Sequence, residues 1–78
     1  MKTVSDSPPR FAVCLNNADY LASLELHKIY RVLPDEEATA DGDLRIIDES
    51  GEDYLYPETY FAVVDLPKAV ESALLQAS

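Results

Sequence analysis

The sequence contains no tryptophan, one cysteine, two glycines and only six basic residues. The single thiol, Cys14, cannot form a disulfide within the chain, which is typical of a protein in a reducing compartment. Because glycine occurs only at Gly42 and Gly51, no glycine-rich loop is available to cradle a phosphate group. No apolar run approaches the roughly 18 residues of a membrane span, and residues 1–9 lack the apolar core of a signal peptide. We therefore expect a cytoplasmic protein without a membrane partner.

Acidic residues outnumber basic residues by fifteen to six among 78, and the formal net charge is −9. A surface that binds nucleic acid needs basic side chains to neutralise phosphates, so we expect no nucleic-acid partner. The hydrophobic fraction of 47% is that of a globular protein, and a chain of this length folds as one domain. Residues 1–9 are polar and contain Pro8-Pro9, which predicts a disordered N-terminal tail before an ordered domain that begins near Arg10.

Apolar and polar residues alternate in short runs along most of the chain, which predicts antiparallel strands. The predicted strands cover residues 11–15, 24–33, 44–48, 53–56 and 61–64. In the first strand, we expect Phe11, Val13 and Leu15 to face the core, with the small Ala12 and Cys14 on the other face. In the last strand, we expect the first and third residues to face inward; these are Phe61 and Val63.

Turn-forming residues separate the predicted strands. Asn16-Asn17-Ala18-Asp19 predicts a loop, because Asn and Asp bond locally to the backbone. Pro34 ends the second strand, since it lacks an amide donor and fixes φ. Residues 35–43 are expected to form an exposed, mobile loop with room for a helical turn at 36–40. Gly51 allows positive φ in a tight turn between the third and fourth strands.

Helical segments are expected around and after the last strand. Pro57 is expected to interrupt strand pairing, and residues 58–60 to form one helical turn. Residues 66–77 predict a C-terminal helix with Pro67 in its first turn. An apolar stripe at helical spacing consists of Leu66, Val70 and Leu74. A helix of three turns is marginally stable alone, so we expect it to pack on the barrel or on a partner.

Short strands with one helical turn before the last strand predict a small barrel. The stretch Leu55-Tyr56-Pro57-Glu58-Thr59-Tyr60-Phe61 resembles the end of Src homology 3 (SH3) domains, where proline, two small or polar residues and tyrosine lie between apolar residues. Residues 24–33 resemble the second strand of that family, and the resemblance covers about residues 11–64. It implies a five-stranded SH3-like β-barrel at residues 10–65 with a short C-terminal helix, as in small bacterial proteins of this type.

The resemblance also implies a peptide-binding face. In SH3 domains, proline-rich peptides bind aromatic side chains of the first strand and its loop, a tryptophan at the start of the third strand, and the proline and tyrosine before the last strand. Pro57 and Tyr60 match the last two positions. The first-strand aromatic positions fall near Cys14 and Asn16, which do not match. The tryptophan position falls near residues 43–44, and the chain has no tryptophan.

Tyrosine accounts for five of the seven aromatic residues. Tyr54, Tyr56 and Tyr60 lie close together in the sequence, and Tyr54 and Tyr56 occupy alternate positions on one face of a strand. Their simplest role is packing within the barrel, with the hydroxyl groups at the surface. The functional alternative is a partly exposed face for an extended peptide, which we assign to Tyr20, Tyr54, Pro57 and Tyr60.

Most of the net charge lies in residues 35–53, where nine acidic side chains face one base, Arg45, for a net charge of −8. The simplest interpretation is solvated loops that keep a small barrel soluble. The alternatives are a docking surface for a basic partner and a calcium site, although neither acidic stretch has the helix-flanked loop of an EF-hand. The acidic residues are Asp35, Glu36, Glu37, Asp41, Asp43, Asp48, Glu49, Glu52 and Asp53.

Cys14 and His27 lack the partners in sequence that metal binding or catalysis requires. His27 lies on the polar face of a predicted strand, and no second His or Cys stands at ligand spacing. We expect Cys14 to be a buried thiol rather than a nucleophile, unless the fold brings His27 beside it. A barrel of this size fills its interior with side chains, so we expect no metal, no cofactor and no catalytic activity.

These observations favour a small acidic SH3-like protein that acts as a non-enzymatic protein–protein interaction module. Its partner is expected to carry a basic or extended segment, and the chain to be a monomer or a weak homodimer. The alternative function is an acidic mimic of nucleic acid that inhibits a basic nucleic-acid-binding protein. A third hypothesis is self-association through the C-terminal helix.

Overall fold

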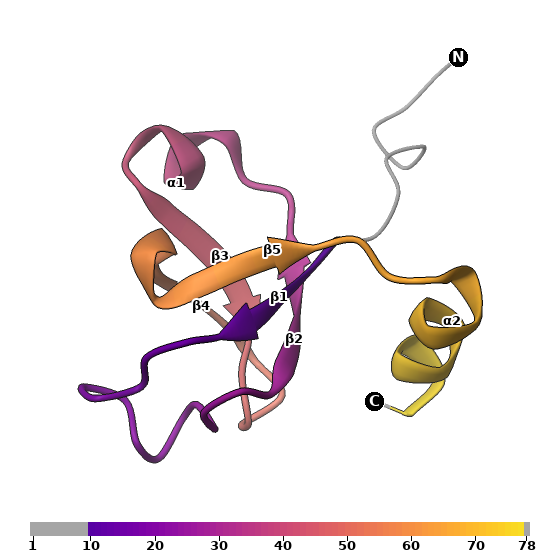
Figure 1. The fold of residues 1–78 in the computed structure, drawn as a ribbon. Coiled ribbons are helices and arrows are strands. Elements are labelled where there is room, and N and C mark those ends of the chain that lie inside the picture. Colours follow the sequence, from indigo (N-terminus) through magenta and orange to yellow (C-terminus); the bar gives the residue numbers. More distant parts are fainter. Residues whose placement is uncertain (1–9, 78) are drawn as a thin grey trace.

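The computed structural model describes residues 10–77, so the predicted tail at residues 1–9 lies outside the described residues. The elements in chain order are β1 (Arg10–Cys14), β2 (Ile29–Leu33), α1 (Glu36–Ala40), β3 (Asp43–Ile47), β4 (Asp53–Pro57), the 3₁₀ helix η2 (Glu58–Tyr60), β5 (Phe61–Val64) and α2 (Lys68–Ala77). Figure 1 shows α2 to one side of the strands, joined to β5 by a short connection. Within the described residues, neither helix has the length and apolar character needed to cross a membrane.

The five strands form one antiparallel sheet in the order β4-β3-β2-β1-β5. The central strand β2 therefore lies between β1 and β3, and β4 and β5 are the two edges (Figure 1). The predicted mostly β class with a short C-terminal helix is confirmed. The sheet is not closed, however, and the barrel stays a prediction.

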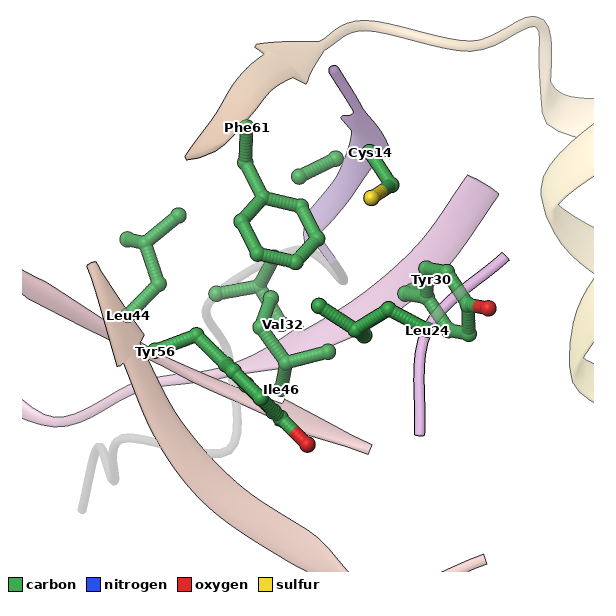
Figure 2. Packing of buried hydrophobic residues seen from close by; sticks show 9 residues of the cluster. Cys14, Leu24, Tyr30, Val32, Leu44, Ile46, Tyr56 and Phe61 are labelled. Atoms are coloured by element: carbon green, nitrogen blue, oxygen red, sulfur yellow. The ribbon is translucent and has the colours of Figure 1, made fainter. Parts of the chain in front are cut away.

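One face of the sheet carries the hydrophobic core (Figure 2). Alternate strand residues point to this face because successive side chains in a strand point to opposite faces. In β2, for example, Tyr30 and Val32 are buried and Arg31 is exposed. The aromatic rings pack on one another, with centroids 6.4 Å apart for Tyr30 and Phe61 and 6.2 Å apart for Tyr56 and Phe61. The core consists of Ala12, Cys14, Leu24, Tyr30, Val32, Leu44, Ile46, Tyr56 and Phe61.

The first strand faces the core with its small residues, so the predicted orientation is wrong. Ala12 and Cys14 are fully buried in the core, whereas Leu15 is 52% exposed. Phe11 is buried too, but as the neighbour of Ala12 in the strand it points to the opposite face. Cys14 lies opposite Phe61 in the register of β1 and β5. The small side chains of Ala12 and Cys14 leave room for the Phe61 ring. The volume of Phe61 on the neighbouring strand β5 therefore decides which face of β1 turns inward.

The second strand is shorter than predicted, because it begins at Ile29 rather than Leu24. Residues 15–28 form a loop between β1 and β2, which we call the long loop. His27 in this loop has a φ of 68°, in the left-handed region that ends an extended strand. Leu26 is 44% exposed, whereas Leu24 reaches the core from the loop with 1% exposure.

The remaining connections follow the local sequence closely. Residues predicted as an exposed loop include α1, in which Ala38 is buried and donates its amide to Asp35 Oδ1 at the N-cap, 2.9 Å away. Gly51 adopts a φ of 85° in the turn between β3 and β4, as predicted. Pro57 does not interrupt pairing, since it lies opposite Asp43 at the end of β4. An edge strand tolerates proline because one side of it needs no amide donor.

Strand β5 is an edge of the sheet and is only partly covered. Phe61 faces the core as predicted, with 7% exposure. Val63 lies on the same face, opposite Ala12 of the core, but is 45% exposed, so the core does not cover it. Beyond β5 no further strand of the described chain continues the sheet, which leaves this end of the inner face open.

Helix α2 lies beside the outer face of the sheet. It follows Pro67, whose carbonyl oxygen accepts the amide of Val70 at 2.9 Å. Leu74 and Leu75 line a groove of about 540 Å³ together with Phe11 of β1. Val70 of the predicted apolar stripe is 39% exposed, so the helix does not bury this face completely.

Candidate functional site

The rings of Tyr20 and Tyr60 meet where η2 joins β5. Tyr20 comes from the long loop, in which its amide donates to the carbonyl of Asn17 at 2.9 Å. Tyr60 is the last residue of η2. The two ring centroids are 5.9 Å apart with an interplanar angle of 65°, an edge-on arrangement that is favourable for aromatic pairs.

Hydrogen bonds hold the long loop against η2. The amide of Leu15 donates to the carbonyl of Tyr60 at 2.7 Å, and the amide of Asn16 reaches the same oxygen at 3.3 Å. The Tyr60 hydroxyl donates to Asp19 Oδ2 at 2.5 Å, which raises the pKa of Tyr60 above its usual value. Segments about forty residues apart in the chain are thereby fixed as one surface.

Tyr56 packs against this surface from the side of the hydrophobic core. Its ring lies edge-on to Tyr20, with centroids 4.8 Å apart and an interplanar angle of 89°. Tyr56 is 3% exposed and belongs to the core, whereas Tyr20 and Tyr60 are only partly buried against it. Pro57 follows Tyr56 directly, caps η2 and is half-buried. We call Tyr20, Pro57 and Tyr60 the tyrosine patch.

Tyr54 lies apart from the other predicted site residues. It is 51% exposed, and its hydroxyl donates to Glu52 Oε1 at 3.0 Å, which raises the pKa of Tyr54. Among the ring contacts of residues 10–77, none involves Tyr54. The structure therefore brings together three of the four residues that we assigned to a peptide-binding face.

Two of the acidic residues bind the one base among them. Arg45 Nε donates to Asp35 Oδ2 at 2.8 Å, and Arg45 Nη1 donates to Asp53 Oδ2 at 2.8 Å. The Ala38 amide and the Arg45 guanidinium lower the pKa of Asp35. This arrangement joins the start of α1 to β3 and β4, so these carboxylates have roles within the domain.

Asp48 is the one buried acidic residue among those described, with 6% exposure. It accepts hydrogen bonds from the Ser50 amide at 2.8 Å and the Ser50 hydroxyl at 2.6 Å, and from the Tyr56 hydroxyl at 2.5 Å. Burial raises the pKa of Asp48, but these bonds outweigh burial and hold the pKa below its usual value. Burial and the same bond raise the pKa of Tyr56 to about 12. Asp48 therefore organises both the turn and the aromatic core.

Glu49 fastens the long loop to the turn between β3 and β4. Its amide donates to the carbonyl of Ser23 at 3.0 Å, and its carboxylate binds Lys28 Nζ at 2.7 Å. The Tyr30 hydroxyl donates to Glu49 at 2.5 Å and accepts from the amide of Glu25 at 2.7 Å. The bonds from Lys28 and Tyr30 lower the pKa of Glu49. The long loop, which carries Tyr20 of the tyrosine patch, is thus held at both ends.

The other four acidic residues of 35–53 have no side-chain partner in the described part of the chain. Within the described residues, no hydrogen bond or ion pair is made by the side chains of Glu36, Glu37, Asp41 and Asp43. Five of the nine predicted acidic residues therefore have structural roles, and the other four lie around α1. In residues 10–77, no three His, Cys, Asp or Glu side chains gather in a way that would hold a metal ion.

Cys14 and His27 are neighbours through the backbone only. The amide of His27 donates to the carbonyl of Cys14 at 2.7 Å. The Cys14 thiol is fully buried and donates to the carbonyl of Asn16 at 3.4 Å, and burial raises its pKa. The exposed His27 therefore does not activate this thiol.

No family model, no curated protein and no solved structure matches the chain. The resemblance of residues 55–61 to SH3 domains accordingly stays a prediction. Function has to follow from the geometry of the tyrosine patch and from the charges around it.

Proposed function

We propose that the chain is a non-enzymatic protein–protein interaction module of the SH3-like type, in which the tyrosine patch binds an extended segment of a partner protein. One observation carries this proposal: the rings of Tyr20 and Tyr60, from distant parts of the chain, pack 5.9 Å apart. Pro57 lies at the start of the same 3₁₀ turn. Partly exposed aromatic rings held in fixed positions bind with little loss of side-chain entropy, which is why Tyr is frequent in interfaces.

The order of elements supports an SH3-like relationship. From the long loop onward, the chain passes through β2, the short helix α1, β3, a tight turn, β4, the sequence proline-x-x-tyrosine and the last strand β5. The strand order places β5 beside β1 and η2 next to the long loop. In SH3 domains, the corresponding proline and tyrosine contact the peptide, and Pro57 and Tyr60 hold those positions in this sequence.

Charge indicates the chemistry of the segment that binds. The protein carries a net charge of −9, and Asp19 accepts the Tyr60 hydroxyl at the border of the tyrosine patch. An extended segment with an arginine or lysine would place its cation beside Asp19 and over a tyrosine ring. We therefore assign to the patch an extended, proline-containing segment with at least one basic residue.

The acidic mimic of nucleic acid has less support. A mimic needs a continuous array of free carboxylates, whereas Asp35, Asp48 and Glu49 bind groups within the domain. Of the nine acidic residues in 35–53, the four whose side chains have no partner within the described part of the chain lie around α1. The interaction module is therefore the better proposal.

Affinity capture from a lysate of the native host tests the proposal when matched variants are compared. Tyr60→Ala removes a ring of the tyrosine patch, and Tyr54→Ala removes an exposed ring outside it. We expect a protein with a proline-containing basic segment to be captured by the wild type and by Tyr54→Ala, and lost with Tyr60→Ala. Capture that is unaffected by Tyr60→Ala, in a variant that melts like the wild type, would contradict the proposal.

A further inference from the structure

The two edges of the sheet differ in how well they are protected against a further strand. An edge strand presents unpaired N–H and C=O groups, and proteins commonly protect such an edge with proline or with charged residues. Strand β4 has both kinds of protection, since it begins at Asp53 and ends at Pro57. Strand β5 has neither, because Phe61–Val64 consists of apolar residues only. The unprotected edge of the sheet is therefore β5.

The backbone groups of Val63 point away from the sheet. The amide of Leu15 donates to the carbonyl of Tyr60 at 2.7 Å, so every second residue back along β1 from Leu15 bonds to β5. These residues lie opposite Ala62 and Val64, whose N–H and C=O groups therefore point to β1. The N–H and C=O groups of Val63 point to the free edge instead. Within the part of the chain that the structure describes, no turn, loop or cap hydrogen bond uses them.

The side chain of Val63 is also uncovered at this edge. It is 45% exposed, although it lies on the same face of β5 as the core residue Phe61. An open cleft of about 380 Å³ lies beside it, so α1 does not cover the edge. Free backbone groups and an uncovered β-branched side chain at one residue suit one kind of occupant, which is another extended strand.

A second copy of β5 fits this edge by symmetry. When two β5 strands pair antiparallel about a two-fold axis at Val63, each Val63 amide donates to the carbonyl of the partner's Val63. The Phe61 amide needs no new acceptor, because it already donates to the carbonyl of Glu58. The two valine side chains lie directly opposite each other and cover one another. A strand of unrelated sequence would fill the backbone bonds of one copy only, whereas this pairing covers the exposed Val63 of both.

We propose that the edge of β5 joins two copies of this chain in an antiparallel strand pair, which makes one sheet continuous across both copies. A stable interface buries roughly 1,200–2,000 Å², and a strand of four residues offers less, so the dimer is weak. Each copy carries a net charge of −9, and salt strengthens the dimer because it screens this repulsion. The proposal does not depend on the tyrosine patch, because it uses the backbone of β5 rather than the rings.

The test follows the full chain up to millimolar concentration by sedimentation equilibrium, in low and in high salt, and by hydrogen exchange of single amides. We expect a dimer that forms at the highest concentrations and is stronger in high salt. The exchange of the Val63 amide should slow as the dimer forms, because this amide gains an acceptor. The amides of Ala62 and Val64 should be protected at every concentration, since they bond to β1.

Leu55 on β4 provides the matched control. It is 45% exposed, as Val63 is. Its backbone groups also point to a free edge, because the Asp48 amide bonds to the Glu52 carbonyl and the direction alternates from there. Val63→Pro removes only the outward amide, so we expect it to weaken the dimer roughly tenfold and Leu55→Pro to leave it unchanged. If Val63→Pro fails to fold, Val63→Lys places a charge at the pair and is compared with Leu55→Lys.

Three outcomes would overturn the proposal. The first is a monomer at every concentration in high salt, because the edge of β5 then does not pair. The second is a dimer that survives Val63→Lys, and its loss in Val70→Lys would place the contact on α2 instead. The third is a dimer in which the exchange of the Val63 amide is unchanged, because the proposed hydrogen bonds would then be absent.

Discussion

Replacement of Tyr56 by phenylalanine removes one hydroxyl group from the core and leaves the ring in place. The hydroxyl donates to Asp48 Oδ2 at 2.5 Å, and the two residues are 3% and 6% exposed. In the variant, the Asp48 carboxylate keeps only the two hydrogen bonds that Ser50 donates to its Oδ1. One oxygen of a buried carboxylate thus loses its donor, and water has little access to replace it.

The magnitude follows from the charge and the burial of the acceptor. A hydrogen bond to a charged group contributes about 1.5–3 kcal/mol, so we expect Tyr56→Phe to lower the free energy of unfolding by about 2 kcal/mol. For a domain of this size, each kcal/mol lowers Tm by roughly 4–8 °C, which gives a decrease of roughly 8–16 °C. A domain of 78 residues has about 4–12 kcal/mol of total stability, so this loss is large but leaves the domain folded.

Urea denaturation at neutral pH provides the assay, with Tyr54→Phe as the control. The Tyr54 hydroxyl bonds to Glu52 at the exposed end of the same strand, and we expect its removal to change stability little. If Tyr56→Phe and Tyr54→Phe unfold at the same urea concentration, the Asp48–Tyr56 bond does not stabilise the core as described.

The same pair predicts a pH dependence. The pKa of Asp48 is lowered in the folded protein, so its contribution is fully present above the pKa of an unfolded aspartate, about 4. This stabilisation of the folded state by ionised Asp48 is lost as the pH falls through the lower pKa that Asp48 has in the folded protein. We expect the stability difference between the wild type and Tyr56→Phe to shrink below about pH 4. A difference that grows on acidification would contradict this sign.

Three further predictions concern other positions. Tyr30→Phe removes the hydroxyl that joins the Glu25 amide to Glu49, so we expect the free energy of unfolding to fall by about 1–2 kcal/mol. We also expect faster hydrogen exchange of the Glu25 amide, and unchanged exchange would count against the anchoring of the long loop. Cys14 is fully buried with a raised pKa, so a thiol reagent should react slowly until denaturant is added, and immediate labelling of the native protein would refute this burial. In Gly51→Ala, the added Cβ has no atom within 4 Å, so only the strained backbone at a φ of 85° should lower the free energy of unfolding, by about 1 kcal/mol in urea denaturation. An unchanged urea midpoint would argue against this backbone conformation.

Local features of the fold could be predicted well from the sequence. Pro34 follows the end of β2, Gly51 supplies a left-handed turn residue, and residues 58–60 form one helical turn. Each of these depends on the conformational preference of one or two residues, which is a property of the chain itself. The helix after Pro67 belongs to the same class.

The face that a strand turns to the core, and the partners of its side chains, depend on tertiary contacts. The alternation of apolar and polar residues along the chain does not encode these contacts. The face of β1 follows from the space that the Phe61 ring needs beside Cys14. The start of β2 follows from the left-handed conformation of His27, which is uncommon for residues other than glycine. Both choices depend on tertiary packing rather than on the local run of residues.

The candidate site was predictable only in part, for the same reason. Pro57 and Tyr60 follow from the resemblance of residues 55–61 to SH3 domains, whereas the contact of Tyr20 with Tyr60 depends on how the long loop folds back. The structural role of Asp48 was missed, because a count of charges does not distinguish a buried acceptor from a solvated one. One signal was present: an aspartate two residues before Ser50 in a glycine-containing turn is typical of a local side-chain turn.

Titration with a synthetic peptide, followed by amide chemical shifts, tests the tyrosine patch most directly. The peptide should be extended and proline-rich, with arginine at one end. We expect the largest shifts at Asp19, Tyr20 and Tyr60, and no binding to Tyr60→Ala. An absence of shifts at these residues at millimolar peptide, or unchanged binding by Tyr60→Ala, would contradict the assignment of this surface as the binding face.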